Sequence, residues 1–194
     1  APILADLLGA GQVAGDGEGE AALADTDGTR VAADDSRNAL VVRTMSKSFS
    51  LAGLRIGFAF GHRALIAGLM KVKDSYNVNR LSQAAALAVL NDPDYFRACI
   101  ACVKATRDRL RAALIALGFS VFPSAANFLL ARPPRPLTAK KLYETLRARQ
   151  ILVRWWNDPR VRNHVRISIG TDDETDKLLA AIREILAQNK EGRF

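Results

Sequence analysis

The sequence predicts an α/β protein, because short apolar stretches alternate with segments that have the periodicity of amphipathic helices. Hydrophobic residues make up 49% of the 194 residues and charged residues 25%, which is ordinary for a globular chain. The character of the chain changes at Ala39, since the preceding residues are rich in Ala, Gly and Asp and the first aromatic residue is Phe49. We therefore expect residues 1–38 to be a poorly ordered, low-complexity acidic segment ahead of a folded body.

Four elements are expected in the first part of that body, over residues 39–92. Apolar runs predict two strands, and apolar residues spaced for one helical face predict two helices. These elements are the strands 39–44 and 56–61 and the helices 63–73 and 82–90. The first strand leads into a polar turn that contains Lys47, at the kind of strand end where open α/β sheets bind ligands.

A long helix opens the second part, residues 93–189, which is followed by a tail at 190–194. Asp92 and Pro93 are typical of a helix start and Gly118 of a helix end, so this helix is long enough to link two domains. Beyond it, strands are predicted at 119–122, 127–131, 151–155 and 165–169.

Capping residues mark the two remaining helices. Thr138 is placed to cap a helix that ends near Arg149. Thr171 and Glu174 have the spacing of a capping box that opens the last helix.

Charge and cysteine content exclude several classes of function. The net charge is +8, but residues 1–38 carry −6 and the rest +14. The basic residues are scattered over helix faces without interleaved aromatics, so we expect no nucleic-acid binding. No run of 18 apolar residues and no signal-peptide pattern occur, so we expect no membrane span. Cys99 and Cys102 have no second Cys/His pair, which argues against a metal site and fits a reduced, cytoplasmic compartment.

The polar turn within residues 44–57 carries the main chemical signal. A lysine, Lys47, lies among hydroxyl side chains, and Arg55 follows eight residues later. A lysine amine can form an imine with an aldehyde, while Thr44, Ser46 and Arg55 can donate hydrogen bonds to phosphate oxygens. This combination suits an aldehyde cofactor that carries a phosphate. The alternative is a solvated surface lysine.

The two halves of this turn, Ser46-Lys47-Ser48-Phe49 and Ala52-Gly53-Leu54-Arg55-Ile56-Gly57, resemble the cofactor-lysine motif of fold-type I, pyridoxal-phosphate-dependent aminotransferases of class I/II. Within that superfamily the chain is most similar to the histidinol-phosphate aminotransferases. The resemblance runs from about residue 38 to about residue 186. It includes residues 73–83, 126–130, 151–154 and 165–171.

This resemblance implies a fold, a cofactor and a reaction. Residues 39–92 would be a remnant of the large cofactor-binding domain with an incomplete sheet, and residues 93–189 the linking helix and a complete small α/β domain. The cofactor would be pyridoxal 5'-phosphate. The reaction would transfer an amino group between L-histidinol phosphate and 2-oxoglutarate, with glutamate as its partner, in histidine biosynthesis. Family members would be cytoplasmic homodimers.

The resemblance also implies roles for individual residues. Lys47 would be the catalytic, cofactor-bearing lysine, and Thr44, Ser46 and Arg55 would bind the cofactor phosphate. Arg154 and Arg166 would bind the substrate anion, the alternative being a structural ion pair on a strand. Asn127 would contact the substrate or cap a strand end. No metal is implied.

One feature of the family is missing from its usual place. Upstream of the lysine the family has an Asp-Glu-Ala-Tyr pattern, whose Asp pairs with the pyridine nitrogen and whose Tyr pairs with the phenolate oxygen. The corresponding residues 15–24 lack this pattern, although Asp16 lies near the expected spacing. We therefore expect a fragment of a longer chain, or a chain with a lost or replaced N-terminal half, with impaired activity.

Three other functions stay open on the sequence. They are an aromatic amino acid aminotransferase, a threonine-phosphate decarboxylase, and a catalytically silent domain used for packing or interaction.

Overall fold

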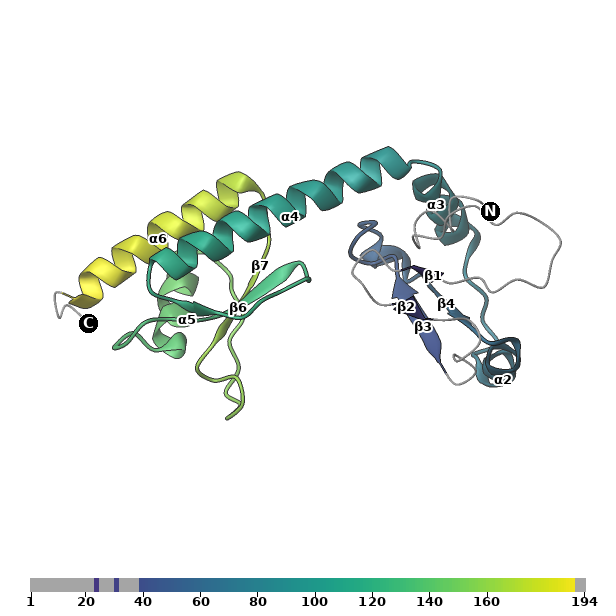
Figure 1. Ribbon diagram of the computed structural model, residues 1–194, viewed down its shortest axis with the longest axis horizontal. Coiled ribbons are helices and arrows are strands. Elements are labelled where there is room, and N and C mark those ends of the chain that lie inside the picture. Colours follow the sequence, from purple (N-terminus) through teal and green to yellow (C-terminus); the bar gives the residue numbers. More distant parts are fainter. Residues whose placement is uncertain (1–22, 25–29, 32–38, 191–194) are drawn as a thin grey trace. The chain divides into compact units, whose positions relative to one another are not determined.

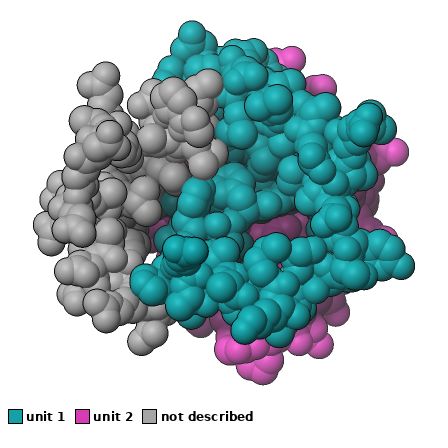
Figure 2. Space-filling view, turned by 90° about the vertical axis from the view of Figure 1, so that its right-hand side faces the viewer, with its two compact units in different colours: residues 1–98 teal, residues 99–194 magenta. Residues whose placement is uncertain are grey.

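The computed structural model describes residues 23–24, 30–31 and 39–190. The chain divides into two compact units, Ala1–Ala98 and Cys99–Phe194, coloured teal and magenta in Figure 2. Most of the predicted acidic segment, Asp16 included, lies outside the described residues, as do residues 191–194 of the predicted tail. Within that segment, strands β1 (Leu23–Ala24) and β2 (Arg30–Val31) form an antiparallel pair.

The first unit contains the four elements that the sequence predicts for residues 39–92. Strands β3 (Leu40–Thr44) and β4 (Gly57–Gly61) pair antiparallel, and a 3-10 turn, η1 (Ala52–Leu54), lies in the loop between them. Helices α2 (Arg63–Val72) and α3 (Arg80–Leu90) follow (Figure 1). Helix α3 begins two residues earlier than predicted, because the Asn79 side chain accepts a hydrogen bond from the Ser82 amide at 2.9 Å.

This unit buries little apolar surface within residues 39–98. In that range the buried side chains are those of Met45, Ser82 and Ala86. Large apolar side chains are exposed on its strands and helices, among them Val42, Met70, Val72, Leu81 and Leu87. Burial of apolar area is the main contribution to folding stability, so packing within residues 39–98 contributes little.

The second unit is an antiparallel sheet with three helices. Its strands are β5 (Ser120–Val121), β6 (Phe128–Arg132) and β7 (Val165–Ser168), in the order β5-β6-β7. The helices are α4 (Pro93–Ala116), whose first six residues belong to the first unit, α5 (Ala139–Ala148) and α6 (Asp172–Lys190) (Figure 1). The predicted domain boundary at residue 92 remains a prediction, because α4 contributes to both units.

One apolar core holds the second unit together. Alternate residues of β6 and β7 point into it, α4, α5 and α6 supply most of the other side chains, and Phe119 and Leu137 come from the connecting segments. Fully buried members include Leu114, Leu129, Leu142, Val165 and Ile182. The intervening strand residues, such as Phe128 and Arg166, lie on the opposite face of the sheet. That face carries the polar and aromatic groups described below.

The predicted helix caps are confirmed. The Asp92 and Thr138 side chains accept hydrogen bonds from amides three residues later, at 3.2 Å each. Gly118 ends α4 with a φ of 86°, a conformation that favours glycine. Thr171 and Glu174 form the reciprocal capping box, with the two bonds at 2.8 and 3.3 Å.

The strand predicted at residues 151–155 is wrong. Only Arg154 in that range pairs, through an isolated antiparallel bridge to Arg166. The Ile151 amide still donates to the Leu146 carbonyl at 2.9 Å and completes the end of α5, with Gln150 at a φ of 62°. Just beyond, residues 158–162 form a turn that leads into β7. The apolar alternation of this segment therefore reflects packing beside the sheet and not continuous pairing.

Candidate functional site

The loop that contains Lys47 is fixed by its buried neighbour, Met45. Met45 is 1% exposed; its amide donates to the Ile56 carbonyl at 3.1 Å, and its carbonyl accepts from the Leu51 amide at 3.0 Å. The first of these bonds extends the β3–β4 register by one pair beyond Thr44 and Gly57. Since neighbouring strand residues point to opposite sides, burial of Met45 directs Thr44 and Ser46 to the other side.

Thr44 and Ser46 form a pair of hydroxyl groups on that side. Thr44 Oγ1 donates to Ser46 Oγ at 2.8 Å and accepts from the Ser46 amide at 3.1 Å. The proton of Thr44 is thus used within the pair, while the Ser46 hydroxyl keeps its own proton for another acceptor. The pair can present a hydroxyl donor to an anion.

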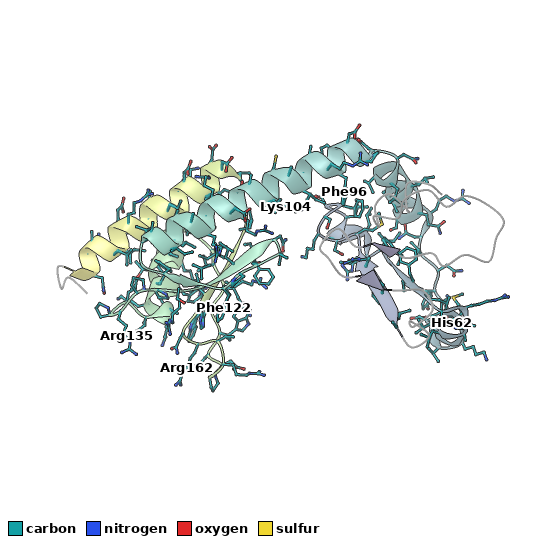
Figure 3. The ribbon with its side chains drawn as sticks, in the orientation of Figure 1. His62, Phe96, Lys104, Phe122, Arg135 and Arg162 are labelled. Carbon is teal, nitrogen blue, oxygen red and sulfur yellow. The ribbon has the colours of Figure 1, made fainter. Side chains whose placement is uncertain are left out.

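Lys47 lies exposed at the start of the next turn, whose Ser50 amide donates to the Lys47 carbonyl at 3.0 Å. Within the described residues, no hydrogen bond or ion pair engages its amine. Phe49 lies in the same turn, and its ring stacks on that of Phe96 with centroids 4.4 Å apart (Phe96 is labelled in Figure 3). This contact fixes the backbone two residues after Lys47 and leaves the amine accessible.

Arg55 occupies a left-handed backbone position, with φ 51° and ψ 47°. Its Nη1 donates to the Ala52 carbonyl at 2.9 Å, which folds the side chain back over η1. Left-handed geometry is unfavourable for a residue other than glycine and is maintained here by the surroundings. A buried hydroxyl contributes, since Ser82 Oγ donates to the Leu54 carbonyl at 2.8 Å, one residue before Arg55.

Gly57 has a steric reason to be glycine. A Cβ at this position would lie 2.7 Å from the Arg43 carbonyl oxygen. The close approach of the two strands at the base of the loop therefore requires glycine. Together, Gly57 and Met45 fix the ends of the segment on which Ser46, Lys47 and Arg55 lie.

A second group of candidate residues lies on the open face of the β5-β6-β7 sheet. Arg154 and Arg166 face each other across the isolated bridge, and each guanidinium lies over the Trp156 ring, at 5.3 and 5.5 Å from its centroid. The Arg166 guanidinium also lies 5.4 Å from the Phe128 centroid, and its Nε is buried without a hydrogen-bond partner. The alternative of a structural ion pair is not met, because no acidic side chain in the described part of the chain pairs with either arginine.

Asn127 immediately precedes β6. Its carbonyl accepts from the Ile169 amide at 2.9 Å, and its exposed side chain makes no hydrogen bond within the described residues. The backbone bond explains its place at the strand end. Its role toward a substrate remains a prediction.

The structure thus brings the predicted residues together in two groups, one in each unit (Figure 2). Thr44, Ser46, Lys47 and Arg55 lie on one loop of the first unit. Arg154 and Arg166 lie side by side in the second unit, with Asn127 at the start of the neighbouring strand. Sequence reasoning missed Trp156 and Ser82. The spacing of Trp156 two residues after Arg154 was the only signal for its place, and nothing local marks the contact of Ser82 with Leu54.

Two other site types are not found in the described residues. No group of three or more His, Cys, Asp or Glu side chains there could hold a metal ion. No helix in that part of the chain is long and apolar enough to cross a membrane.

Comparison with known proteins places this chain in a family. Residues 10–182 match the family described as aminotransferase class I and II. The chain belongs to the class I and II aminotransferases. This agrees with the cofactor-lysine motif around Lys47, and the cofactor of the family is pyridoxal phosphate.

Among class I and II aminotransferases, the similar curated relatives are histidinol-phosphate aminotransferases. That of Microcystis aeruginosa is 53% identical over 152 residues, which cover 78% of this chain and 43% of the relative. Histidinol-phosphate aminotransferase 2 of Burkholderia mallei is 52% identical over 153 residues, covering 77% and 43%. The chain therefore spans about 43% of the length of these relatives.

Solved structures of class I and II aminotransferases have the same fold over that part. Histidinol-phosphate aminotransferase from Sinorhizobium meliloti, solved in complex with pyridoxal-5'-phosphate, superposes with a TM-score of 0.69 and 28% identity, covering 78% of this chain and 42% of that one. The enzyme from Clostridium acetobutylicum gives a TM-score of 0.69 and 26% identity, covering 75% and 45%. The predicted fold class, a mixed α/β part of a fold-type I aminotransferase, is confirmed.

Proposed function

We propose that this chain supplies the cofactor lysine and the substrate-binding arginines of an enzyme that transfers an amino group between L-histidinol phosphate and 2-oxoglutarate. The observation that carries the proposal is the exposed Lys47, which has no partner among the described residues and follows a hydroxyl pair eight residues before Arg55, in a chain 53% identical to a histidinol-phosphate aminotransferase over 152 residues.

The residues around Lys47 fit pyridoxal phosphate by their donor chemistry. A phosphate dianion accepts hydrogen bonds from hydroxyl and guanidinium groups, which Ser46 and Arg55 provide. Both residues flank the last paired position of the two strands, because Ser46 directly follows Met45 and Arg55 directly precedes Ile56, whose carbonyl accepts from the Met45 amide. Thr44 acts through Ser46, since its hydroxyl proton is already donated there.

Lys47 has two tasks in this proposal. Its Nζ first holds the cofactor, and later moves a proton at the substrate carbon. When bound, pyridoxal phosphate supplies the aldehyde that takes up the amino group and the ring that stores electrons during the proton transfer. Stacking of Phe49 on Phe96 supports the turn so that the amine keeps its position through both tasks.

Arg154 and Arg166 are proposed to bind the anionic end of both substrates. A guanidinium group donates paired hydrogen bonds either to the phosphate of histidinol phosphate or to a carboxylate of glutamate and 2-oxoglutarate. Asn127 would contact the substrate from the start of β6. The enzyme would work in histidine biosynthesis, as a cytoplasmic homodimer, as the resemblance to the family implies.

Relative rates on three substrates test the proposal. The 194-residue chain, supplied with pyridoxal phosphate and 2-oxoglutarate, is assayed for glutamate formation from L-histidinol phosphate and from phenylalanine, and for carbon dioxide release from O-phosphothreonine. We expect slow turnover, because residues 15–24 lack the acid and tyrosine pattern of the family, with histidinol phosphate preferred at least about tenfold, the discrimination that one or two charged contacts give.

Other outcomes would assign the alternatives. Preference for phenylalanine would indicate an aromatic aminotransferase, and carbon dioxide release a threonine-phosphate decarboxylase. No turnover, with a chain that stays colourless after incubation with the cofactor, would indicate a silent domain. No observation favours the decarboxylase, because the solved L-threonine-O-3-phosphate decarboxylase from Porphyromonas gingivalis is 23% identical, a likeness that shows the fold alone.

A further inference from the structure

Trp156 shares one side of the sheet with the two arginines. Residues directly opposite in an antiparallel pair point to the same face, which groups Arg154 with Arg166. Trp156 follows Arg154 by two residues, and both guanidinium groups lie over its ring, at 5.3 and 5.5 Å from the centroid. Both distances are within the range of a cation–π interaction.

Trp155 has a different role, although it is the next residue. Its ring stacks on Tyr143 with centroids 6.2 Å apart, and its Nε1 donates to the Arg162 carbonyl at 2.7 Å. It packs against the apolar core. Trp155 therefore anchors the segment to the second unit, whereas Trp156 faces the arginines.

The arginine pair is electrostatically unfavourable by itself. Like charges directly opposite on paired strands repel, and in the described part of the chain no carboxylate pairs with Arg154 or Arg166. In addition, the Nε of Arg166 is buried without a partner. The Trp156 ring offsets part of the repulsion, because the negative face of an aromatic ring attracts both guanidinium groups that lie over it. A bound anion would offset the rest.

We propose that Trp156 is the positioning residue of this site. Its ring holds the two guanidinium groups close together, and this arrangement favours binding of a phosphate dianion over binding of a carboxylate. The inference rests on the proposed function, since it concerns how Arg154 and Arg166 bind substrate. Phosphate carries more charge and three terminal oxygens, so it gains more than a carboxylate from two guanidinium groups held together. When the ring is removed, the arginines separate and this difference shrinks.

The test measures binding of two ligands to the 194-residue chain and to single variants. Phosphorus NMR titration gives the Kd of L-histidinol phosphate, and competition gives that of 2-oxoglutarate. The variants are Trp156→Ala, Trp156→Leu, which keeps apolar bulk without a π face, and Trp156→Phe, which keeps a ring. Phe122→Ala is the matched control, because Phe122 is an exposed aromatic after β5 that contacts His164 and neither arginine (Figure 3).

We expect Trp156→Ala and Trp156→Leu to weaken binding of histidinol phosphate about tenfold, as the loss of two cation–π contacts implies. Binding of 2-oxoglutarate should weaken by about threefold or less. Trp156→Phe should restore the phosphate affinity to within about threefold, and Phe122→Ala should change neither Kd. Rescue by Phe but not by Leu separates the cation–π role from simple packing.

Several outcomes would overturn the inference. An equal loss of affinity for both ligands would show that Trp156 only fills space. Equal affinity of the Leu and Phe variants for histidinol phosphate would show the same. Normal binding by the Trp156 variants, with loss in Arg154→Ala and Arg166→Ala, would remove its role and leave the proposed function intact. Unchanged binding in the arginine variants would instead refute the substrate assignment itself. Should Trp156→Ala unfold, as circular dichroism would reveal, the Leu and Phe pair still decides.

Discussion

Arg154 and Arg166 exchange backbone hydrogen bonds, each amide donating to the carbonyl of the other, at 3.0 and 2.8 Å. This short bridge is the one point in residues 151–156 at which the segment pairs with β7. It sets two cationic side chains next to each other on the face of the sheet that the apolar core does not occupy. An anion bound there would offset the repulsion between the two cationic side chains, which gives a chemical reason for the pairing.

The first prediction concerns these arginines. Arg154→Ala and Arg166→Ala should each weaken binding of L-histidinol phosphate about 10- to 100-fold, the range for a lost hydrogen bond to a charged group. The effect should be larger for Arg166, whose side chain is half-buried, than for the exposed Arg154. Arg183→Ala, an exposed arginine of α6, is the control for net charge and should bind normally. Equal weakening in all three variants would point to a general charge effect instead of a site.

The second prediction concerns the core of the second unit. Leu142→Ala should lower the free energy of unfolding by about 2–5 kcal/mol, because Leu142 is 0% exposed and its removal leaves a cavity among core side chains. Leu152→Ala, with Leu152 82% exposed, should cost less than about 0.5 kcal/mol. Urea unfolding followed by tryptophan fluorescence reports on this unit, since Trp155 and Trp156 are the only tryptophans in the chain. Similar losses in both variants would mean that this core does not determine stability.

Local signals in the sequence predicted most of the helices and their ends. Asp92, Thr138 and the Thr171 and Glu174 pair act within one helical turn, so their spacing was sufficient to locate the caps. The fold class was predictable because local signals also marked the alternation of strands and helices, and because the motif around Lys47 indicated the family. Pairing of residues 151–155 could not be predicted in this way, because it depends on where α5 ends and on the turn after Asp158.

The charged residues of the candidate site were proposed from the sequence, and their roles stay predictions, whereas the residues that support them were not proposed. The lysine and the arginines could be proposed because they lie in motifs that are recognisable in the sequence. Trp156 and Ser82 act through contacts with residues that are fixed only by the tertiary structure, namely Arg166 and Leu54. The sequence was expected to lack the acid that pairs with the pyridine nitrogen, and Asp16, which is near the expected spacing, lies outside the described residues.

The third prediction is a pH dependence of stability that arises from His164. Its pKa is lowered from the ordinary value of 6.5, chiefly by burial and also by the nearby positive charge of Arg132. The folded protein therefore favours the neutral imidazole, and the unfolded chain binds more protons between the two pKa values. This contribution is fully present above about pH 6.5 and is lost as the pH falls through the folded-state pKa.

The comparison of the chain with His164→Gln isolates that contribution. Free energies of unfolding are measured from pH 8 to pH 5, and the difference between pH 7.5 and pH 5.5 is taken for each protein. We expect the loss on acidification to be smaller for the glutamine variant, which has no titrating ring beside Phe122. An equal or larger loss in the variant would show that other groups produce the pH dependence.

Covalent labelling is the direct measurement of whether Lys47 holds pyridoxal phosphate. The 194-residue chain is incubated with pyridoxal phosphate, reduced with borohydride, digested, and the labelled lysines are quantified by mass spectrometry. Lys104, an exposed lysine of α4, gives the reactivity of a surface amine (Figure 3), and Lys47→Ala and Lys104→Ala are treated in parallel. We expect the label at Lys47 to exceed that at Lys104 at least about tenfold. Free phosphate should suppress the label at Lys47 by competing for Ser46 and Arg55, and Lys47→Ala alone should lose it. Label spread evenly over the exposed lysines, and insensitive to phosphate, would refute the assignment of Lys47.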